Sequence, residues 1–294
     1  MNKTLIDQIG NTPLVKSMAL NTNPNVTLYF KLEGNNPGGS VKDRAAYNMI
    51  KNALDSKTIT KTTKLIEATS GNTGIALAMI ASIFNLEIEL VMPDNATKER
   101  VQTMRAYGAK VTLHPEGIEG ARDYADAKVA NEGYYAFNQF ANEDNWKAHY
   151  KTTGPEIWRD TEGKVTHFVA TMGTTGTIMG TSTFLKEQNK SIQIVGVQPM
   201  DGSQIPGIRK WPEAYLPKIF DASKVDQIFE VNRDECIHMT RRLAKEEGIL
   251  AGMSSGGSAA VALKLANQLE SGIIVSIICD RGDRYLSSEL FEDL

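Results

Sequence analysis

Apolar residues along this chain fall into two patterns that alternate almost from end to end. Short runs rich in Val, Ile and Leu predict strands, and longer stretches with apolar positions three or four residues apart predict helices. In the first half we expect a turn and a short extended piece over 7–15, and strands over 26–32, 64–68, 87–92, 110–113 and 134–137. The helices expected between them cover 40–54, 74–84, 96–107 and 120–131.

The second half of the chain repeats this alternation. We expect helices over 146–159, 176–188, 234–247 and 255–269, and strands over 165–170, 192–198, 225–231 and 273–279. Strands that alternate with helices form parallel sheets covered on both faces. A length of 294 residues fits two domains. The prediction is therefore an α/β protein with domains 1–148 and 149–294, each an open, mostly parallel sheet flanked by helices. The irregular segment 202–217 is expected to be a functional or packing loop.

Composition narrows the class of protein. A hydrophobic fraction of 41% and a charged fraction of 23% are typical of a globular protein. A net charge of -3 argues against nucleic acid or an anionic membrane as a partner. The longest apolar run, 75–84, is half the length of a membrane span, and the N-terminus lacks the apolar core of a signal peptide. The two cysteines and four histidines are scattered, so we expect no metal and reduced thiols in a cytoplasm.

The loop 34–44 contains a lysine in an unusual place. It reads GNNPGGSVKDR and leads directly into a helical pattern. Ser40, followed three residues later by Asp43, predicts a capping box at the helix start. Lys42 then lies in the first turn, where the helix dipole disfavours a cation, and its neutral amine can form a Schiff base with a carbonyl. The alternative is an ordinary surface lysine beside a helix cap.

Three further loops have the composition of ligand-binding loops. Residues 69–74 (TSGNTG) and 173–177 (GTTGT) each follow a predicted strand and precede a helix, where amides and hydroxyls can bind a phosphate or carboxylate. Residues 252–257 (GMSSGG) are the third loop. The first two match neither the dinucleotide fingerprint nor the nucleotide P-loop. Each loop alone could be an ordinary capped connection. Together with the lysine they predict a cofactor phosphate in one and a substrate carboxylate in another.

Five segments identify a family. GNTPL, SVKDR, TSGNTG, GTTGT and SSGG follow one another at residues 10–14, 40–44, 69–74, 173–177 and 254–257. With these segments the chain resembles, over nearly its whole length, the cysteine synthase family of pyridoxal-phosphate enzymes, which have fold type II (tryptophan synthase β-like). Residues 205–212 (IPGIRKWP), 278–285 (ICDRGDRY) and the pair Gln139-Phe140 are most similar to the B type of this family.

The resemblance implies a cofactor, pyridoxal 5'-phosphate, and a role for each matching residue. Lys42 would bind the cofactor covalently and then act as the base, Asn72 would bind the ring hydroxyl, and Ser254 would meet the ring nitrogen. The cofactor phosphate would be held by Gly173, Thr174, Thr175, Gly176 and Thr177. The α-carboxylate of the substrate would be bound by Thr69, Ser70, Thr73 and Gln139.

The implied reaction is a β-replacement in which O-acetyl-L-serine and sulfide give L-cysteine through an aminoacrylate. The resemblance places Arg209 and Lys210 at the position where B-type enzymes have two arginines. Such a basic pair could bind thiosulfate, which would give S-sulfocysteine as the product. Lys210 lacks the bidentate fork of an arginine. The family also implies a cytoplasmic homodimer, with residues 1–35 packed on the C-terminal domain. Cys279 is interpreted as a packing thiol.

Other activities stay open at this point. The fold also serves serine or threonine dehydratases and cystathionine β-synthases, and O-phosphoserine could replace O-acetylserine as the donor. A non-catalytic binding protein on this scaffold is the alternative from a different class.

Overall fold

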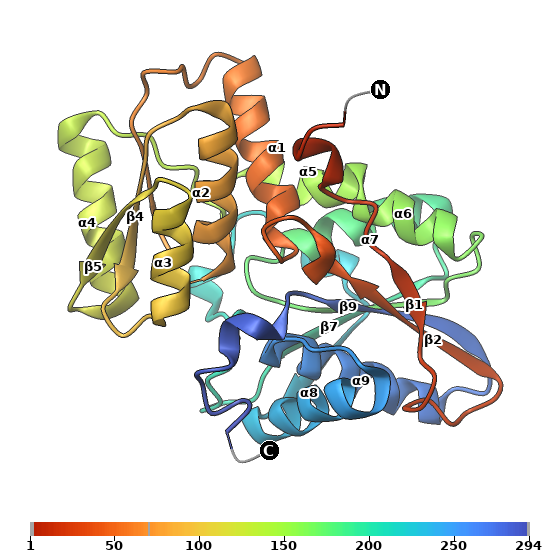
Figure 1. The fold of residues 1–294 in the computed structure, drawn as a ribbon. Coiled ribbons are helices and arrows are strands. Elements are labelled where there is room, and N and C mark those ends of the chain that lie inside the picture. The colour runs from red at the N-terminus through yellow and green to blue at the C-terminus, as the bar shows by residue number, and fades with distance from the viewer. Residues whose placement is uncertain (1–2, 70, 293–294) are drawn as a thin grey trace. The chain divides into compact units, whose positions relative to one another are not determined.

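The structure of this chain is a computed structural model that describes residues 3–69 and 71–292. It contains two compact units (Figure 1). Unit 1 combines Met1–Val41 with Trp146–Leu294, and unit 2 is Lys42–Asn145. Unit 2 is thus an insertion in the chain of unit 1. The sequence-based division at residue 148 stays a prediction.

A six-stranded sheet forms the centre of unit 1, in the order β1-β2-β9-β6-β7-β8. β1 is antiparallel to β2, and every other pair is parallel. The strands are β1 (Leu14–Lys16), β2 (Val26–Leu32), β6 (His167–Thr171), β7 (Gln193–Pro199), β8 (Gln227–Val231) and β9 (Gly272–Ile278). This confirms the predicted open, mostly parallel sheet.

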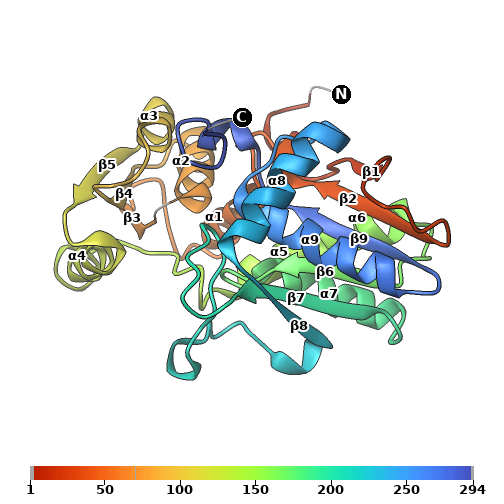
Figure 2. The same cartoon turned by 90° about the horizontal axis from the view of Figure 1, so that it is seen from below.

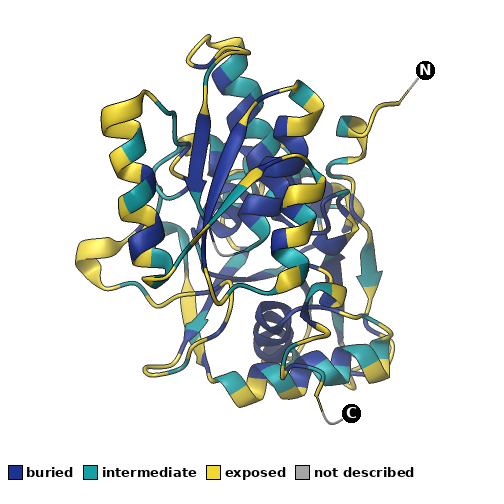
Figure 3. Cartoon of the chain, turned by 60° about the vertical axis from the view of Figure 1, so that its left-hand side comes forward, coloured by how far each residue is buried: buried dark blue, intermediate teal, exposed yellow. Residues whose placement is uncertain are grey.

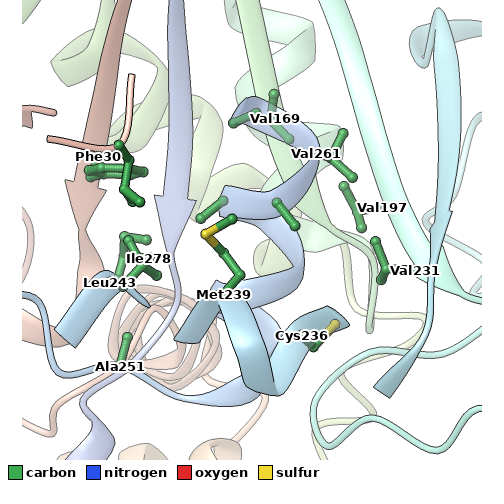
Figure 4. Packing of buried hydrophobic residues seen from close by; sticks show 14 of the residues in the cluster. Phe30, Val169, Val197, Val231, Cys236, Met239, Leu243, Ala251, Val261 and Ile278 are labelled. Carbon is green, nitrogen blue, oxygen red and sulfur yellow. The ribbon is translucent and has the colours of Figure 1, made fainter. Parts of the chain in front are cut away.

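Helices cover both faces of this sheet (Figure 2). The alternation of side chains along β6 shows why. Val169 packs in a buried cluster with residues of α8 (Arg233–Glu247) and α9 (Met253–Gln268), which Figure 4 shows from close by. Its neighbour Phe168 belongs to the cluster on the opposite face, with residues of the other helices. Those helices are α5 (Glu143–Lys151), α6 (Thr153–Asp160) and α7 (Gly176–Gln188).

Unit 2 has a smaller parallel sheet in the order β3-β4-β5. β3 and β4 are mostly dark blue in Figure 3, because helices bury them, whereas β5 at the edge is partly exposed. α4 packs on one face, where Ala121 and Ala125 meet Ile66 and Val91. Tyr135 pairs with Leu65 at the edge of β3, as the extended segment 134–137 predicted. The elements are β3 (Leu65–Ala68), β4 (Ile88–Pro93), β5 (Lys110–His114), α1 (Lys42–Asp55), α2 (Asn72–Phe84), α3 (Lys98–Ala106) and α4 (Gly117–Glu132).

The single helix predicted over 146–159 is wrong. Two helices, α5 and α6, occupy this region, and the chain breaks at Thr152. Pro155 is the physical reason: it has no N–H for a helical bond to residue 151, and its ring disfavours a helical carbonyl there. α2 and α9 also begin two residues earlier than expected, at Asn72 and Met253.

Short 3₁₀ turns complete the structure. The segment 202–217 is irregular, as expected, apart from one such turn. The turns are Ile6–Gln8, Glu33–Asn35, Glu213–Tyr215, Ala222–Lys224 and Gly282–Tyr285. Among the described residues, no helix combines the length and apolar content that a membrane crossing needs. Within residues 3–69 and 71–292, His, Cys, Asp and Glu side chains do not gather in groups of three or more that could hold a metal ion.

Candidate active site

Lys42 is the first residue of α1 and is half-buried. The backbone that leads to it pairs with a distant part of unit 1. The Val41 N–H donates to the Cys279 carbonyl at 2.8 Å, and Ser40 forms an antiparallel bridge with Asp280. This pairing fixes where the helix starts, and therefore where the lysine side chain leaves the backbone.

The helix after Ser40 begins later than expected, at Lys42, and the capping box stays a prediction. Ser40 lies in an extended segment that pairs with Asp280, and Val41 immediately precedes the first helical residue. Asp43 does lie in the first turn, where the helix dipole favours a carboxylate.

The turn before Lys42 is tightly packed at Gly39. Its φ of +81° is in the left-handed region, and a Cβ there would stand 2.3 Å from Nη2 of Arg284. The same Nη2 donates to the Gly38 carbonyl at 2.8 Å. A side chain at position 39 would therefore displace the guanidinium that holds the turn before Lys42.

The predicted carboxylate-binding loop lies in unit 2, between β3 and α2. Thr69 is buried, and its Oγ1 accepts from the Gly71 N–H at 3.3 Å. Thr73 donates its hydroxyl to Oε1 of Gln139 at 2.8 Å, so the structure brings these two predicted residues together. Asn72 is the first residue of α2. Ser70 lies outside the described residues.

The predicted phosphate loop lies in unit 1, between β6 and the N-terminus of α7. Thr175 precedes α7 with a left-handed φ of 69°, and its Oγ1 is buried without a hydrogen-bond partner. The first amides of a helix have no partner within the helix. A buried orphan hydroxyl beside such amides fits the phosphate of the cofactor.

His149 supports this loop, and the sequence analysis missed it. Its Nε2 lies 3.4 Å from the Thr177 hydroxyl, and its Nδ1 lies 2.8 Å from Oγ1 of Thr153. The imidazole is buried. No local pattern marks this histidine, because its partner Thr177 is 28 residues further along the chain.

The segment 205–212 packs directly on the phosphate loop. A Cβ at Gly173 would stand 2.4 Å from the Gly207 carbonyl oxygen. The Trp211 indole donates to the Gly173 carbonyl at 2.7 Å, and the Arg209 N–H donates to the Met172 carbonyl at 2.9 Å. Ile205 and Ile208 anchor the segment in the core. Its backbone is therefore fixed beside the predicted phosphate site.

The two basic residues of this segment have different surroundings. The exposed guanidinium of Arg209 lies over the Trp211 ring, 5.4 Å from its centroid. The ammonium of Lys210 lies 2.8 Å from Asp201 and 2.7 Å from Glu230. Hydrogen bonds to these carboxylates raise the pKa of Lys210. Two carboxylates thus already balance the Lys210 charge, and Arg209 is the better placed of the two to receive an anion.

Ser254 lies in the first turn of α9 and is buried. The turn is held by a residue that the sequence analysis did not single out: the Asp280 carboxylate accepts from the Gly252 N–H at 3.2 Å and from the Tyr285 hydroxyl. Ser255 accepts from the Cys279 N–H at 2.9 Å. The Cys279 side chain is half-buried and packs against the apolar core of unit 1.

Comparisons with known proteins show the family to which this chain belongs. Residues 5–280 match the family described as pyridoxal-phosphate dependent enzyme. The chain is 57% identical to cysteine synthase B of Pseudomonas aeruginosa, over 98% of this chain and 97% of that protein. It is 54% identical to cysteine synthase B of Salmonella typhimurium, over 98% of this chain and 96% of that protein.

A solved structure shares the fold. The cysteine synthase of Entamoeba histolytica superimposes with a TM-score of 0.93 and is 34% identical, covering 99% of this chain and 91% of that chain.

Proposed function

Because this chain belongs to the family of pyridoxal-phosphate dependent enzymes, we propose that it makes L-cysteine from O-acetyl-L-serine and sulfide. The observation that carries the proposal is the 57% identity to a cysteine synthase B over 98% of the chain. The test is product analysis with purified holoenzyme, O-acetylserine and sulfide. Cysteine and acetate in equal amounts are expected. Pyruvate as the main product would instead indicate a dehydratase.

Each predicted residue has a task in this reaction. The Lys42 amine would bind the cofactor and move the proton of the substrate α-carbon. The cofactor ring, when bound, stabilises negative charge on that carbon. Asn72 would orient the ring through its hydroxyl. The Ser254 hydroxyl would leave the ring nitrogen largely neutral, which suits loss of a β-substituent better than transamination.

The remaining residues hold the charged groups of cofactor and substrate. The segment 173–177 would bind the phosphate through amides and hydroxyls. Thr69, Ser70, Thr73 and Gln139 would bind the substrate α-carboxylate and exclude water from the reacting groups. Thr73 already occupies Oε1 of Gln139, which leaves the Nε2 group as the donor that this amide can offer to a carboxylate.

The orphan hydroxyl of Thr175 gives a test of the phosphate loop. Thr175→Val should lower cofactor affinity about tenfold, because a hydrogen bond to a charged phosphate is lost. Thr181→Val is the matched control, since the Thr181 Oγ1 is also buried without a partner but lies further along α7. The measurement is the dissociation constant of pyridoxal phosphate from titration of the apoenzyme. Equal effects of the two changes would remove Thr175 from phosphate binding.

Arg209 leads to a proposal about the sulfur donor. We propose that this guanidinium binds thiosulfate. Thiosulfate has charged oxygens that can accept hydrogen bonds from a guanidinium, and sulfide has none. Arg209→Ala should lower kcat/KM for thiosulfate about tenfold, with a much smaller loss for sulfide. Lys210→Ala should cost less, because Asp201 and Glu230 already engage the Lys210 ammonium. Equal losses of Arg209→Ala with both donors would contradict this role.

The same kinetic assays with O-phosphoserine in place of O-acetylserine decide which of these two amino acids is the substrate. The homodimer and the cytoplasmic location stay predictions. A non-catalytic binding protein on this scaffold would bind no cofactor at Lys42 and form no cysteine.

A further inference from the structure

Glu67 is a buried carboxylate in the middle of the predicted substrate-binding elements. It lies near the end of β3, two residues before Thr69, and is only 5% exposed. The neighbouring Ile66 is fully buried and apolar. A carboxylate in such surroundings needs specific partners to stay in place.

Its partners are backbone N–H groups of one segment, 137–139. The N–H groups of Phe137 and Asn138 donate to the same oxygen, Oε2, at 3.0 and 3.3 Å. The Gln139 N–H also donates a hydrogen bond to this carboxylate. These donors come from a part of the chain 70 residues away from Glu67. One buried side chain therefore joins two segments that the sequence separates widely.

The segment that Glu67 holds has an unusual backbone. Asn138 adopts a left-handed φ of 51°. Two amide side chains fix its carbonyls, from Asn142 to Phe137 at 3.0 Å and from Asn145 to Gln139 at 2.7 Å. Both the carbonyls and the N–H groups of this segment are thus hydrogen-bonded to side chains, which fixes the backbone from which the Gln139 side chain extends.

The Gln139 side chain is where this support reaches the loop that we propose binds the substrate. Its Oε1 accepts the Thr73 hydroxyl at 2.8 Å. A continuous path of hydrogen bonds thus runs from Glu67 through the backbone at 137–139 and the Gln139 amide to Thr73. A shift of the backbone at position 139 would move both side chains.

We propose that Glu67 is a positioning residue, whose ionised carboxylate holds segment 137–139 so that the Gln139 amide, fixed at Oε1 by the Thr73 hydroxyl, presents its Nε2 group to the substrate α-carboxylate. This inference rests on the proposed function. Hydrogen bonds to an ionised acceptor are about twice as strong as neutral ones, so the hold weakens when Glu67 binds a proton.

The charge state of Glu67 can change near neutral pH. Burial raises the pKa of Glu67 to about 7, although the three backbone N–H groups and Arg122 of α4 oppose the shift. Glu67 also acts on the Tyr135 hydroxyl, whose pKa is raised by its own burial, by Asp144 of α5 and by Glu67. A carboxyl with a raised pKa is ionised only above that value, so substrate affinity should rise with pH through about 7.

The first test compares the pH dependence of KM for O-acetylserine in wild-type and Glu67→Gln holoenzymes. The glutamine oxygen can replace Oε2 but carries no charge and does not titrate. Wild-type KM should fall about tenfold from about pH 6 to about pH 8, with less change in kcat. The variant should keep the higher KM at both values. Because the substrate titrates identically in both assays, its own ionisation cancels in the ratio. An unchanged pH profile in the variant would overturn the inference.

Glu89→Gln is the matched control. Glu89 is a buried carboxylate in the same sheet, on β4, but its partners are Lys110 and Thr112 of β5. This change should leave the pH profile of KM as in the wild type. A flattened profile in Glu89→Gln would show that general loss of buried charge, and not support of segment 137–139, causes the effect.

A second measurement does not depend on activity. Hydrogen–deuterium exchange at amides 137–139, corrected for intrinsic rates, should slow above about pH 7 in the wild type and not in Glu67→Gln. Equal protection in both proteins would overturn the positioning role. If exchange follows this expectation but the wild type forms no cysteine, the proposed function fails and the effect of Glu67 on the backbone still stands.

Discussion

Replacing Lys42 by alanine should lower the rate of cysteine formation by at least about 10³-fold, because one amine both binds the cofactor and moves the α-proton. Product analysis with saturating O-acetylserine and sulfide measures this loss. Borohydride reduction of the wild-type holoenzyme, followed by peptide mass spectrometry, should find the cofactor on the peptide that contains Lys42. The fold should be retained, since Lys42 is the half-buried first residue of its helix.

Lys51→Ala is the control for this experiment. Lys51 lies on the same helix and is also half-buried, but its ammonium is paired with Asp55 one turn further on. Its loss should leave turnover and cofactor content close to the wild-type values. A Lys42→Ala enzyme with ordinary turnover, or a cofactor recovered on another lysine, would exclude Lys42 from the chemistry.

The second large effect is on stability, at the contact between α8 and α9. A Cβ at Gly256 would stand 2.2 Å from the Cys236 carbonyl oxygen and 2.2 Å from Oγ1 of Thr240. The carbonyl is part of a helix, and the fully buried Thr240 hydroxyl donates to it at 2.8 Å. Gly256→Ala should therefore lower the free energy of unfolding by about 3 kcal/mol, as overpacking forces the helices apart. At a helix position without such contacts, replacing glycine by alanine would instead raise the free energy of unfolding by roughly 0.5–1 kcal/mol.

Urea denaturation of both proteins measures this difference. Gly71→Ala is the matched substitution, because a Cβ there would meet no other atom within 4 Å. Its unfolding midpoint should stay near that of the wild type, whatever it does to activity. A Gly256→Ala protein as stable as Gly71→Ala would mean that α8 and α9 separate at little cost.

Most of the fold could be predicted because each element carries its own signal. The apolar run of β2 and the glycine at the start of α7 gave both elements their observed bounds, Val26–Leu32 and Gly176–Gln188. The break at Thr152 does not follow from the apolar period, which continues through Pro155, because only the proline constraint indicates it.

The support of the site was much harder to predict. The motifs contain Lys42, Thr73 and Gln139, but the sequence does not indicate that Glu67 holds the backbone of Gln139, because that contact spans 70 residues. The start of α1 differs from the expected one for a similar reason: the Ser40 backbone pairs with Asp280, near the other end of the chain, and the helix begins only at Lys42. Local patterns predict which residues take part, and long-range contacts decide how each is held.

The pairing of β2 with β9 has a consequence for how the protein is made in the cell. Val26 to Leu32 finds its parallel partner only in Gly272 to Ile278, and the turn before Lys42 finds its partner in residues 279–281. Ribosomes synthesise the N-terminal part first, at roughly 5–20 residues per second. Unit 2 is therefore complete long before unit 1 can close its sheet. We expect the nascent chain to be inactive until its last strand has left the exit tunnel, so that translation itself delays the appearance of the lysine site.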